Sequence, residues 1–469
     1  MRKSIFVVSD LHLGGAPAGN GSPDFQICSP AGQALLAEFV RWVADQHTTT
    51  QRTHLVLAGD IVDFLAEREF SAFCSDDSLA EEKLDHIMER TAPFWNNLRS
   101  LLERGASLTF QLGNHDLELS LPRCRRLLRD RLGPGDFDFI YDNQAFTEGP
   151  VLIEHGNRYD AWNVVPHDTL REIRSALSRG EEPREFAGVP GSRMVIEVMN
   201  ELKSEYAFVD LLKPENEAVL PLLAVLDPAS LSAINKVAKF AVLKNLNRFA
   251  EDGVPVDNGN IATLQEVAAE ETESQKEMLA LARELAYGGD VGNISAMDTA
   301  SHFLARIRGA ANAAVRDAQI TSLYRAFRAW AGAHARAFDV AHEGDEYLKP
   351  ARATAKRGYK VIVYGHTHLV KRVRLDQGAV YLNSGTWADL MKVPQSILTG
   401  SDEAQARKDL ENFTADLLAN RVAQWRQTIP AFARIDMQSG NVEKADVYFF
   451  DGYDKVERVP DGQIAKLVY

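Results

Sequence analysis

The segment IFVVSDLH, residues 5–12, decides the fold class of this chain. Its apolar run is typical of a buried β-strand and ends abruptly at an Asp-x-His triplet. The runs at 54–58 and 107–112 repeat the pattern, since each is compact, apolar and followed at once by a polar loop that contains glycine. The stretches between the runs carry apolar residues at helical spacing. This β-α-β-α-β order predicts an α/β sheet with right-handed crossovers, whose loops at the strand ends line the functional crevice.

The rest of the chain changes character twice. Helical periodicity dominates from about residue 165 to residue 357, and strand patterns resume at residue 360. We therefore predict a first part of the α/β core at 1–164, a helical insertion at 165–357 and a second part of the core at 358–469. Further strands are predicted at 137–141, 151–154, 360–364, 371–375, 380–383, 432–437 and 446–450, with a helical segment near 402–427.

The composition limits the class of protein. The 469 residues are 45% hydrophobic and 25% charged, which is ordinary for a soluble globular chain. A formal net charge of -14 argues against a stable nucleic-acid coat, although bound divalent metals would invert the local sign and admit a nucleotide-like substrate. The three cysteines show no metal or disulfide spacing, which indicates reduced thiols. The N-terminal apolar run is too short for a signal peptide, and no apolar run is long enough to span a membrane. We predict a cytoplasmic location, with the inner face of a membrane as a peripheral alternative.

Five polar motifs lie where an apolar run meets a loop. Any single one of them can arise by chance, and a lone histidine after a strand is more often a structural residue than a ligand. Five loops at strand ends can converge on one edge of a sheet, however, and chance then explains the set poorly. The motifs are Asp10-Leu11-His12, Gly59-Asp60-Ile61-Val62-Asp63, Gly113-Asn114-His115-Asp116, His155-Gly156 and Gly365-His366-Thr367-His368.

These residue types suit phosphoester hydrolysis. The reaction needs charge neutralisation on the phosphate, a strong nucleophile at neutral pH and help for the leaving oxygen. Two cations about 3.5–4 Å apart supply the first two. Imidazole, carboxylate and amide ligands suit Mn, Fe, Zn, Co or Ni. We therefore predict two divalent metal ions, manganese first among them, with Asp60 as the candidate bridge between them.

The five motifs resemble those of the calcineurin-like metallophosphoesterase superfamily in order, residue type and strand-end placement. The resemblance covers about residues 4–160 and 358–390. It implies a four-layer α/β/β/α sandwich in which the late strands form a second sheet, here with a large helical insertion. It also implies that His115 protonates the leaving group or contacts the phosphate, oriented by Asp116. The implied ligands of one metal are Asp10, His12, Asp60 and His368, and those of the other are Asp60, Asn114, His155 and His366.

Two further residues are candidates for substrate binding. Arg158 follows motif four, and a guanidinium suits a substrate phosphate, with a surface salt bridge as the competing interpretation. Asp63 is a candidate for substrate contact or for a hydrogen bond to a ligand histidine. A cap at the start of the following segment explains Asp63 equally well.

The substrate class is read from motif three and the insertion. The D-L-H-L opening, the short His-Gly motif and the helical insertion resemble the pyrophosphatases that cleave UDP-2,3-diacylglucosamine in lipid A synthesis. Those enzymes carry Arg where this chain has His115, and the insertion here is larger. With a histidine at position 115, motif three resembles instead that of phosphodiesterases and nucleases of the superfamily, which use this position as an acid. We predict hydrolysis of a phosphodiester or pyrophosphate bond in a phosphorylated small-molecule, nucleotide or lipid-linked substrate.

Two other functions fit the same motifs. The first alternative is a UDP-sugar-lipid pyrophosphatase-like enzyme at the membrane surface. The second is a non-catalytic scaffold, which is disfavoured because every ligand position is filled. The insertion separates motifs four and five, so its base emerges beside the metals and a substrate-selecting cap is the natural hypothesis for it.

Overall fold

A computed structural model describes residues 2–18, 24–200, 203, 209–211, 320–321, 323–325, 327–328, 331, 335–419 and 421–464. The chain separates into two compact units. Unit 1 comprises Met1–Ile196, Ala337–Leu390 and Gln427–Val468, and unit 2 comprises Glu197–Arg336, Met391–Arg426 and Tyr469. Most of the predicted insertion lies outside the described residues, so its division at 165–357 and its cap role stay predictions.

Unit 1 is built on a seven-stranded sheet in the order β16-β15-β14-β1-β3-β5-β6. The strands β1, β3, β5 and β6 run parallel, and β14, β15 and β16 extend the sheet antiparallel on the other side of β1. The predicted βαβ crossovers are thereby confirmed. The bounds are Arg2–Val8 (β1), Gln51–Ala58 (β3), Ser107–Gln111 (β5), Asp136–Ile140 (β6), Ala431–Gln438 (β14), Asn441–Phe450 (β15) and Val456–Arg458 (β16).

A second sheet of unit 1 has the order β10-β11-β9-β8-β7. Its central pairs β11–β9 and β9–β8 are parallel, and its outer pairs are antiparallel. The implied placement of the late strands is wrong in part, because β14 and β15 belong to the larger sheet. The bounds are Phe146–Glu148 (β7), Val151–Ile153 (β8), Val361–Tyr364 (β9), Val370–Arg374 (β10) and Val380–Ser384 (β11).

The pleat of β1 shows why the two sheets form separate layers. Side chains alternate between the two faces of a strand, so an uninterrupted apolar run buries both faces. Ile5 and Val7 pack with Val363 and Leu382 of the smaller sheet, whereas Phe6 packs on the opposite face among helical residues. Strand β14 buries one apolar face, Ala431, Ala433, Ile435 and Met437, in the same cluster as Ile5 and Val7, whereas Arg434 and Asp436 on its other face are half-buried.

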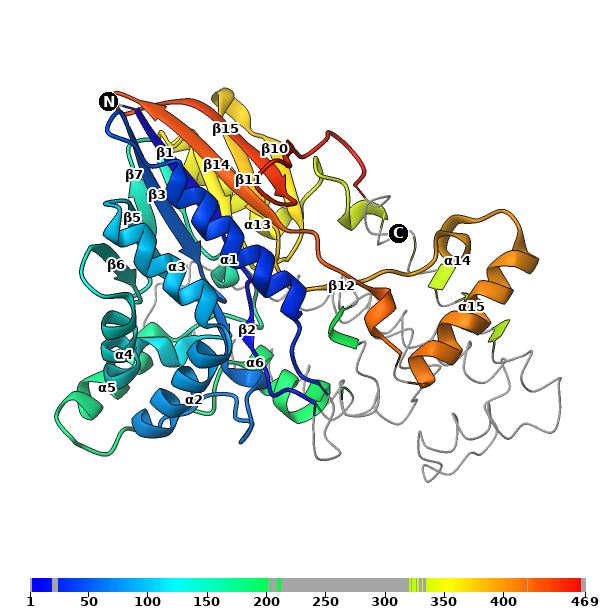
Figure 1. The fold of residues 1–469 in the computed structure, drawn as a ribbon, viewed down its shortest axis with the longest axis horizontal. Helices are drawn as coiled ribbons and strands as arrows, with labels where there is room; N and C mark the ends of the chain where they lie inside the picture. The colour runs from blue at the N-terminus through cyan, green and yellow to red at the C-terminus, as the bar shows by residue number, and fades with distance from the viewer. Residues whose placement is uncertain are drawn as a thin grey trace, which may run out of the picture. The chain divides into compact units, whose positions relative to one another are not determined.

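Helices cover the two outer faces of the sheets. The helices α1, α2, α3 and α4 contribute to the core on the outer face of the larger sheet, and Figure 1 shows α1 and α3 in front of that sheet. The helix α13 packs on the smaller sheet through Tyr347, Leu348 and Ala351. The predicted four-layer α/β/β/α order is confirmed. The bounds are Pro30–Asp45 (α1), Asp77–Arg90 (α2), Ala92–Glu103 (α3), Pro122–Leu132 (α4), His167–Ser178 (α5), Pro190–Met194 (α6) and Asp345–Lys356 (α13).

The described residues of unit 2 include the helices α14 (Gln395–Thr399) and α15 (Glu403–Leu418). Asp402 caps α15 by accepting a hydrogen bond from the backbone N–H of Gln405. The predicted helical segment near 402–427 therefore ends early, and a 3₁₀ turn at Ala423–Trp425 follows it. The side chain of Arg328 donates hydrogen bonds to the carbonyl oxygens of Leu398 and Gly400.

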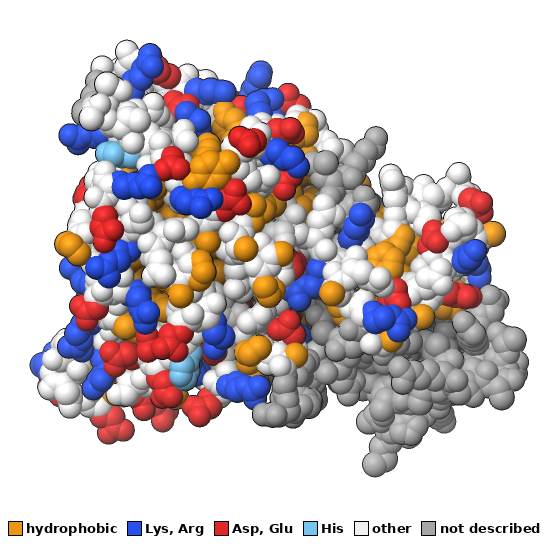
Figure 2. Space-filling model, in the orientation of Figure 1, with side chains coloured by type: hydrophobic (Ala, Val, Ile, Leu, Met, Phe, Trp, Pro, Cys, Tyr) orange, Lys and Arg blue, Asp and Glu red, His pale blue; other side chains and the backbone are white. Residues whose placement is uncertain are grey.

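The described surface mixes charges of both signs. On the face in Figure 2, Lys and Arg side chains alternate with Asp and Glu, and hydrophobic side chains occur in small groups between them. Within the part of the chain that the structure describes, no helix combines the length and the apolar character needed to cross a membrane.

Candidate active site

Motifs one and two are joined through their backbones. The backbone N–H of Asp10 donates to the carbonyl of Gly59 at 3.1 Å, and that of His12 donates to the carbonyl of Asp60 at 3.0 Å. The short strands β2 (Leu13–Gly14) and β4 (Val62–Asp63) continue this pairing in parallel. The two loops therefore form one hydrogen-bonded unit at the carboxyl ends of β1 and β3.

Backbone strain is concentrated in the motifs. Among the described residues, nine that are not glycine have positive φ, and five of these are predicted metal ligands. The left-handed region is costly for residues with a Cβ atom and persists only where the surrounding structure enforces it. Here it turns each side chain sharply inward at a strand end. The five residues are Asp10, His12, Asp60, His366 and His368, with φ between 44° and 68°.

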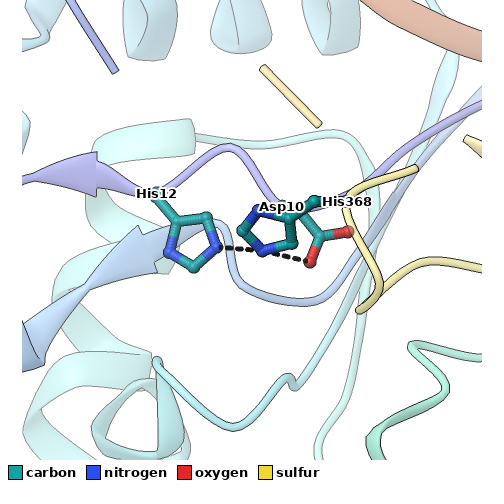
Figure 3. A group of neighbouring side chains, drawn as sticks. All are labelled: Asp10, His12 and His368. Atoms are coloured by element: carbon teal, nitrogen blue, oxygen red, sulfur yellow. Dashed lines mark hydrogen bonds and ion pairs between the residues drawn. The ribbon is translucent and has the colours of Figure 1, made fainter. Parts of the chain in front are cut away.

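One group of ligand-capable side chains unites motifs one and five. Figure 3 shows Asp10, His12 and His368 with their polar atoms turned toward one another. The Nε2 atoms of His12 and His368 are 3.1 Å apart, and Nε2 of His368 lies 3.4 Å from Oδ1 of Asp10. One ligand atom from each residue falls within 4.8 Å of the others, which suits a single ion.

A second group unites motifs two, four and five through Asp60, His155 and His366. Oδ2 of Asp60 lies 3.2 Å from Nε2 of His155 and 3.9 Å from Nε2 of His12, so one carboxylate oxygen faces a histidine of each group. Among the described residues, His12, Asp60 and His115 also form such a group. It shares His12 with the first group and Asp60 with the second.

The donor set fits a pair of cations. Nδ1 of His155 lies 2.8 Å from the carbonyl oxygen of Ala58 and donates to it, so in the neutral ring a lone pair on Nε2 faces the carboxylate of Asp60. Two facing lone pairs repel unless a proton or a metal cation lies between them. Oδ1 of Asp10 and Oδ1 of Asn114 are also buried and accept no hydrogen bond from any residue that the structure describes, which is costly without an ion.

Asp63 is the carboxylate that holds two histidine rings. Its Oδ2 lies 3.3 Å from Nδ1 of His12, and its Oδ1 lies 3.3 Å from Nδ1 of His115. Although burial acts in the opposite direction, His115 and His12 hold the pKa of Asp63 well below its usual range. Oδ1 also accepts the N–H of Leu65, so the predicted cap of the following turn is present as well.

The expected contact between Asp116 and His115 is not found. Each carboxylate oxygen of Asp116 accepts a backbone N–H, from Ile61 and from Gly113, both at 2.7 Å. Asp116 therefore braces motifs two and three against each other. The carboxylate beside Nδ1 of His115 is that of Asp63.

The buried acids and histidines of the centre shift the pKa values of one another. Burial disfavours the charge of Asp60, yet His155 and His115 outweigh it and hold the pKa of Asp60 well below its usual range. Burial acts to lower the pKa of His155, but Asp60 and Asp10 raise it to about 9. Burial and the charge of Asp60 raise the pKa of Asp116 to about 8. A carboxylate must be deprotonated to bind a metal ion, and the lowered pKa of Asp60 favours that form.

Gly113 allows the close approach of motifs two and three. A Cβ atom at this position would overlap Oδ1 and the amide nitrogen of Asp60. Oδ1 of Asp60 accepts the N–H of His115 at 2.8 Å, so the missing side chain lets Asp60 lie directly against the backbone of the third motif.

Residues 3–189 match the family model described as calcineurin-like phosphoesterase. This part of the chain belongs to the calcineurin-like phosphoesterase family. The match includes the first four motifs, and the fifth joins the same site from residues 365–368. The chain is accordingly a metal-dependent phosphoesterase. A search of curated proteins found no match.

The structure brings most predicted site residues of the phosphoesterase together. Arg158 differs, because its side chain is 47% exposed and pairs with Glu154 at 3.8 Å, as the competing interpretation expected. Sequence reasoning missed two residues that touch the site. Oδ2 of Asp160 lies 3.0 Å from Nε2 of His366, and Oδ1 of Asn163 accepts a hydrogen bond from Nδ2 of Asn114. Their signal was their position directly after motif four.

Proposed function

We propose that the phosphoesterase hydrolyses a phosphodiester or pyrophosphate bond at a two-metal centre, with manganese as the favoured ion. The observation that carries the proposal is the position of Asp60, whose Oδ2 faces His12 on one side and His155 on the other. A carboxylate so placed is suited to bridge two ions.

The ligands divide into two sets that share Asp60. Asp10, His12 and His368 would complete the set of one ion. Asn114, His155 and His366 would complete that of the second. His155 and His366 lie with Asp60, and Oδ1 of Asn114 is buried with no hydrogen bond from the described part of the chain. When bound, two divalent cations neutralise phosphate charge and supply an activated water as nucleophile.

His115 is proposed to protonate the leaving oxygen. Its ring packs edge-on against that of His12, with centroids 4.7 Å apart, and its side chain is 20% exposed, in contrast to the nearly buried His12. Asp63 anchors Nδ1 of the ring, so Nε2 is the nitrogen that exchanges a proton with a substrate. We assign Asp63 to positioning, because both of its oxygens are engaged and the residue is 5% exposed.

The proposed substrate is a phosphorylated small molecule or nucleotide. The histidine at position 115 supports an acid-assisted phosphodiesterase over the UDP-sugar-lipid alternative. That alternative stays a prediction, since residues 212–319, where an acyl-chain cap is expected, lie outside the described part of the chain. Arg158 remains a candidate for a substrate phosphate because it follows the ligand His155 on an exposed turn.

Turnover of bis-p-nitrophenyl phosphate with Mn²⁺ tests the proposal. The protein should hydrolyse this diester, and H115A should lower kcat about 10²–10⁴-fold with metal content unchanged. The variant D60N should lose bound metal as well as activity. His86 is exposed on α2, and H86A is the matched control with unchanged kcat. Inactive wild-type protein that binds Mn²⁺ would favour the scaffold, and loss of metal in H115A would contradict the acid role.

A further inference from the structure

The turn that follows motif four is held by its own side chains. Nδ2 of Asn157 donates to the carbonyl of Asn163 at 2.9 Å, and Nδ2 of Asn163 donates to Oδ2 of Asp160 at 2.7 Å. The N–H of Trp162 donates to Oδ1 of Asp160 at 2.9 Å. These bonds close residues 157–163 into a rigid loop that holds the carboxylate of Asp160 and the side-chain amide of Asn163 at fixed positions.

Each of those groups contacts a proposed ligand of the second ion. Oδ1 of Asn163 accepts a hydrogen bond from Nδ2 of Asn114 at 3.2 Å, which turns Oδ1 of Asn114 the other way. Oδ2 of Asp160 lies 3.0 Å from Nε2 of His366, which leaves Nδ1 of that ring for an ion. Asn114 and His366 come from motifs three and five, so this one loop orients ligands from two distant parts of the sequence.

We propose that Asp160 and Asn163 are positioning residues that set the affinity of the second metal site. A carboxylate that accepts the outer N–H of a ligand histidine fixes the tautomer of the ring and raises the basicity of the ring. Substitution of such a carboxylate typically lowers metal affinity or activity 10–100-fold. Asp160 stands in this relation to His366, and Asn163 fixes the orientation of the Asn114 amide. The inference rests on the proposed function, which assigns Asn114 and His366 to the second ion.

Helix α6 covers the same network. The N–H of Gly191 donates to the carbonyl of Trp162 at 2.9 Å, and a Cβ atom at position 191 would overlap Oδ1 of Asn163. The φ of Gly191 is not positive, so its backbone accepts alanine without strain. The substitution G191A would therefore push the amide of Asn163 away from Asn114 with no change in charge.

Calorimetric titration of the metal-free full-length protein with Mn²⁺ tests the inference. Wild-type protein should show two sites. In D160N the first site should be unchanged and the second weakened about 10–100-fold. G191A should weaken the same site. The control is D168N, which removes an exposed carboxylate whose partner is Arg171 on the next turn of α5, and it should bind as wild type does.

The outcomes separate the inference from the proposed function. Two unchanged sites in D160N would overturn the inference, as would a lower Tm without a change in second-site affinity, since that indicates a purely structural role. If D160N does not fold, G191A decides in the same way, because the three atoms nearest to its added methyl group all belong to the side chain of Asn163. Wild-type protein with one site, or N114A with both sites intact, would instead contradict the proposed ligand sets.

Discussion

Oδ1 of Asp63 lies 3.3 Å from Nδ1 of His115, across the two loops that carry motifs two and three. The other oxygen of the same carboxylate lies 3.3 Å from Nδ1 of His12. One buried acid thus orients the proposed proton donor and a proposed metal ligand together. This arrangement couples the protonation chemistry of the site to the geometry of the metal centre.

The substitution D63N should lower kcat about 10–100-fold, because an amide holds the two rings less firmly than a carboxylate does. Steady-state kinetics with bis-p-nitrophenyl phosphate and metal analysis by mass spectrometry check this prediction. The ion held by Asp10, His12 and His368 should bind more weakly in D63N, because Asp63 also orients the ring of His12, whereas the second site should keep its affinity. The variant D85N, which removes a surface carboxylate paired with Arg131, should behave as wild type. Unchanged kcat in D63N would refute the positioning role.

Removal of metal should destabilise the fold around the site. Without cations, burial raises the pKa of Asp10, and the charge of Asp60 raises it further. An ion that binds only the folded protein stabilises it by about 2.7 kcal/mol at one hundred times its Kd. Thermal denaturation with and without Mn²⁺ should therefore show a higher Tm with metal, and the rise should shrink in D60N. An equal rise in D60N would show that the ion acts elsewhere.

The substitution G113A should abolish the close contact between motifs two and three. The added methyl group would overlap Oδ1 of Asp60, and a displacement of about 1 Å at a catalytic group costs roughly 10²-fold in rate. Kinetics and Mn²⁺ titration should both show a loss. Alanine at Gly32 of α1 is the control, because the nearest atoms to its Cβ would be at 3.5 Å, an ordinary contact distance. Equal behaviour of the two variants would contradict the argument.

The stability of unit 1 should fall in mild acid because of His54. Burial, together with the charge of Lys3, lowers the pKa of His54 to about 3, from about 6.5 in the unfolded chain. Below pH 6.5 the unfolded state therefore binds a proton that the folded state does not. The free energy of unfolding falls by about 1.4 kcal/mol per pH unit from this group. In the folded protein, Nε2 of His54 lies 2.8 Å from Oγ1 of Thr109, and Nδ1 of His54 lies 3.9 Å from Oε2 of Glu148.

Urea titrations at pH 7 and pH 5 isolate this contribution. In H54Q the loss of stability between the two pH values should be smaller than in wild-type protein by about 2 kcal/mol. H86Q on the exposed face of α2 should retain the wild-type loss. An identical loss in all three proteins would show that His54 is not held neutral.

The sequence by itself predicted the strands and the chemistry of the site. Apolar runs such as Ile5–Val8 are buried on both faces, and a polar motif after such a run must lie at a strand end. That information is local, because burial and backbone conformation recur with the period of each element. The motifs therefore predicted the ligand types and the family before any contact between them was known.

The tertiary structure alone decided which side chains meet. Asp116 is next to His115 in sequence, yet the sharp turn of motif three directs its carboxylate to the N–H groups of Ile61 and Gly113. Asp63, from another motif, takes the place beside His115. Strand β14 likewise joined the larger sheet, where it pairs antiparallel with β1 and buries its one apolar face in the same cluster as Ile5 and Val7. Periodicity fixes the face on which a residue lies, whereas the neighbour across a loop depends on strand order and on left-handed backbone turns that no local pattern encodes.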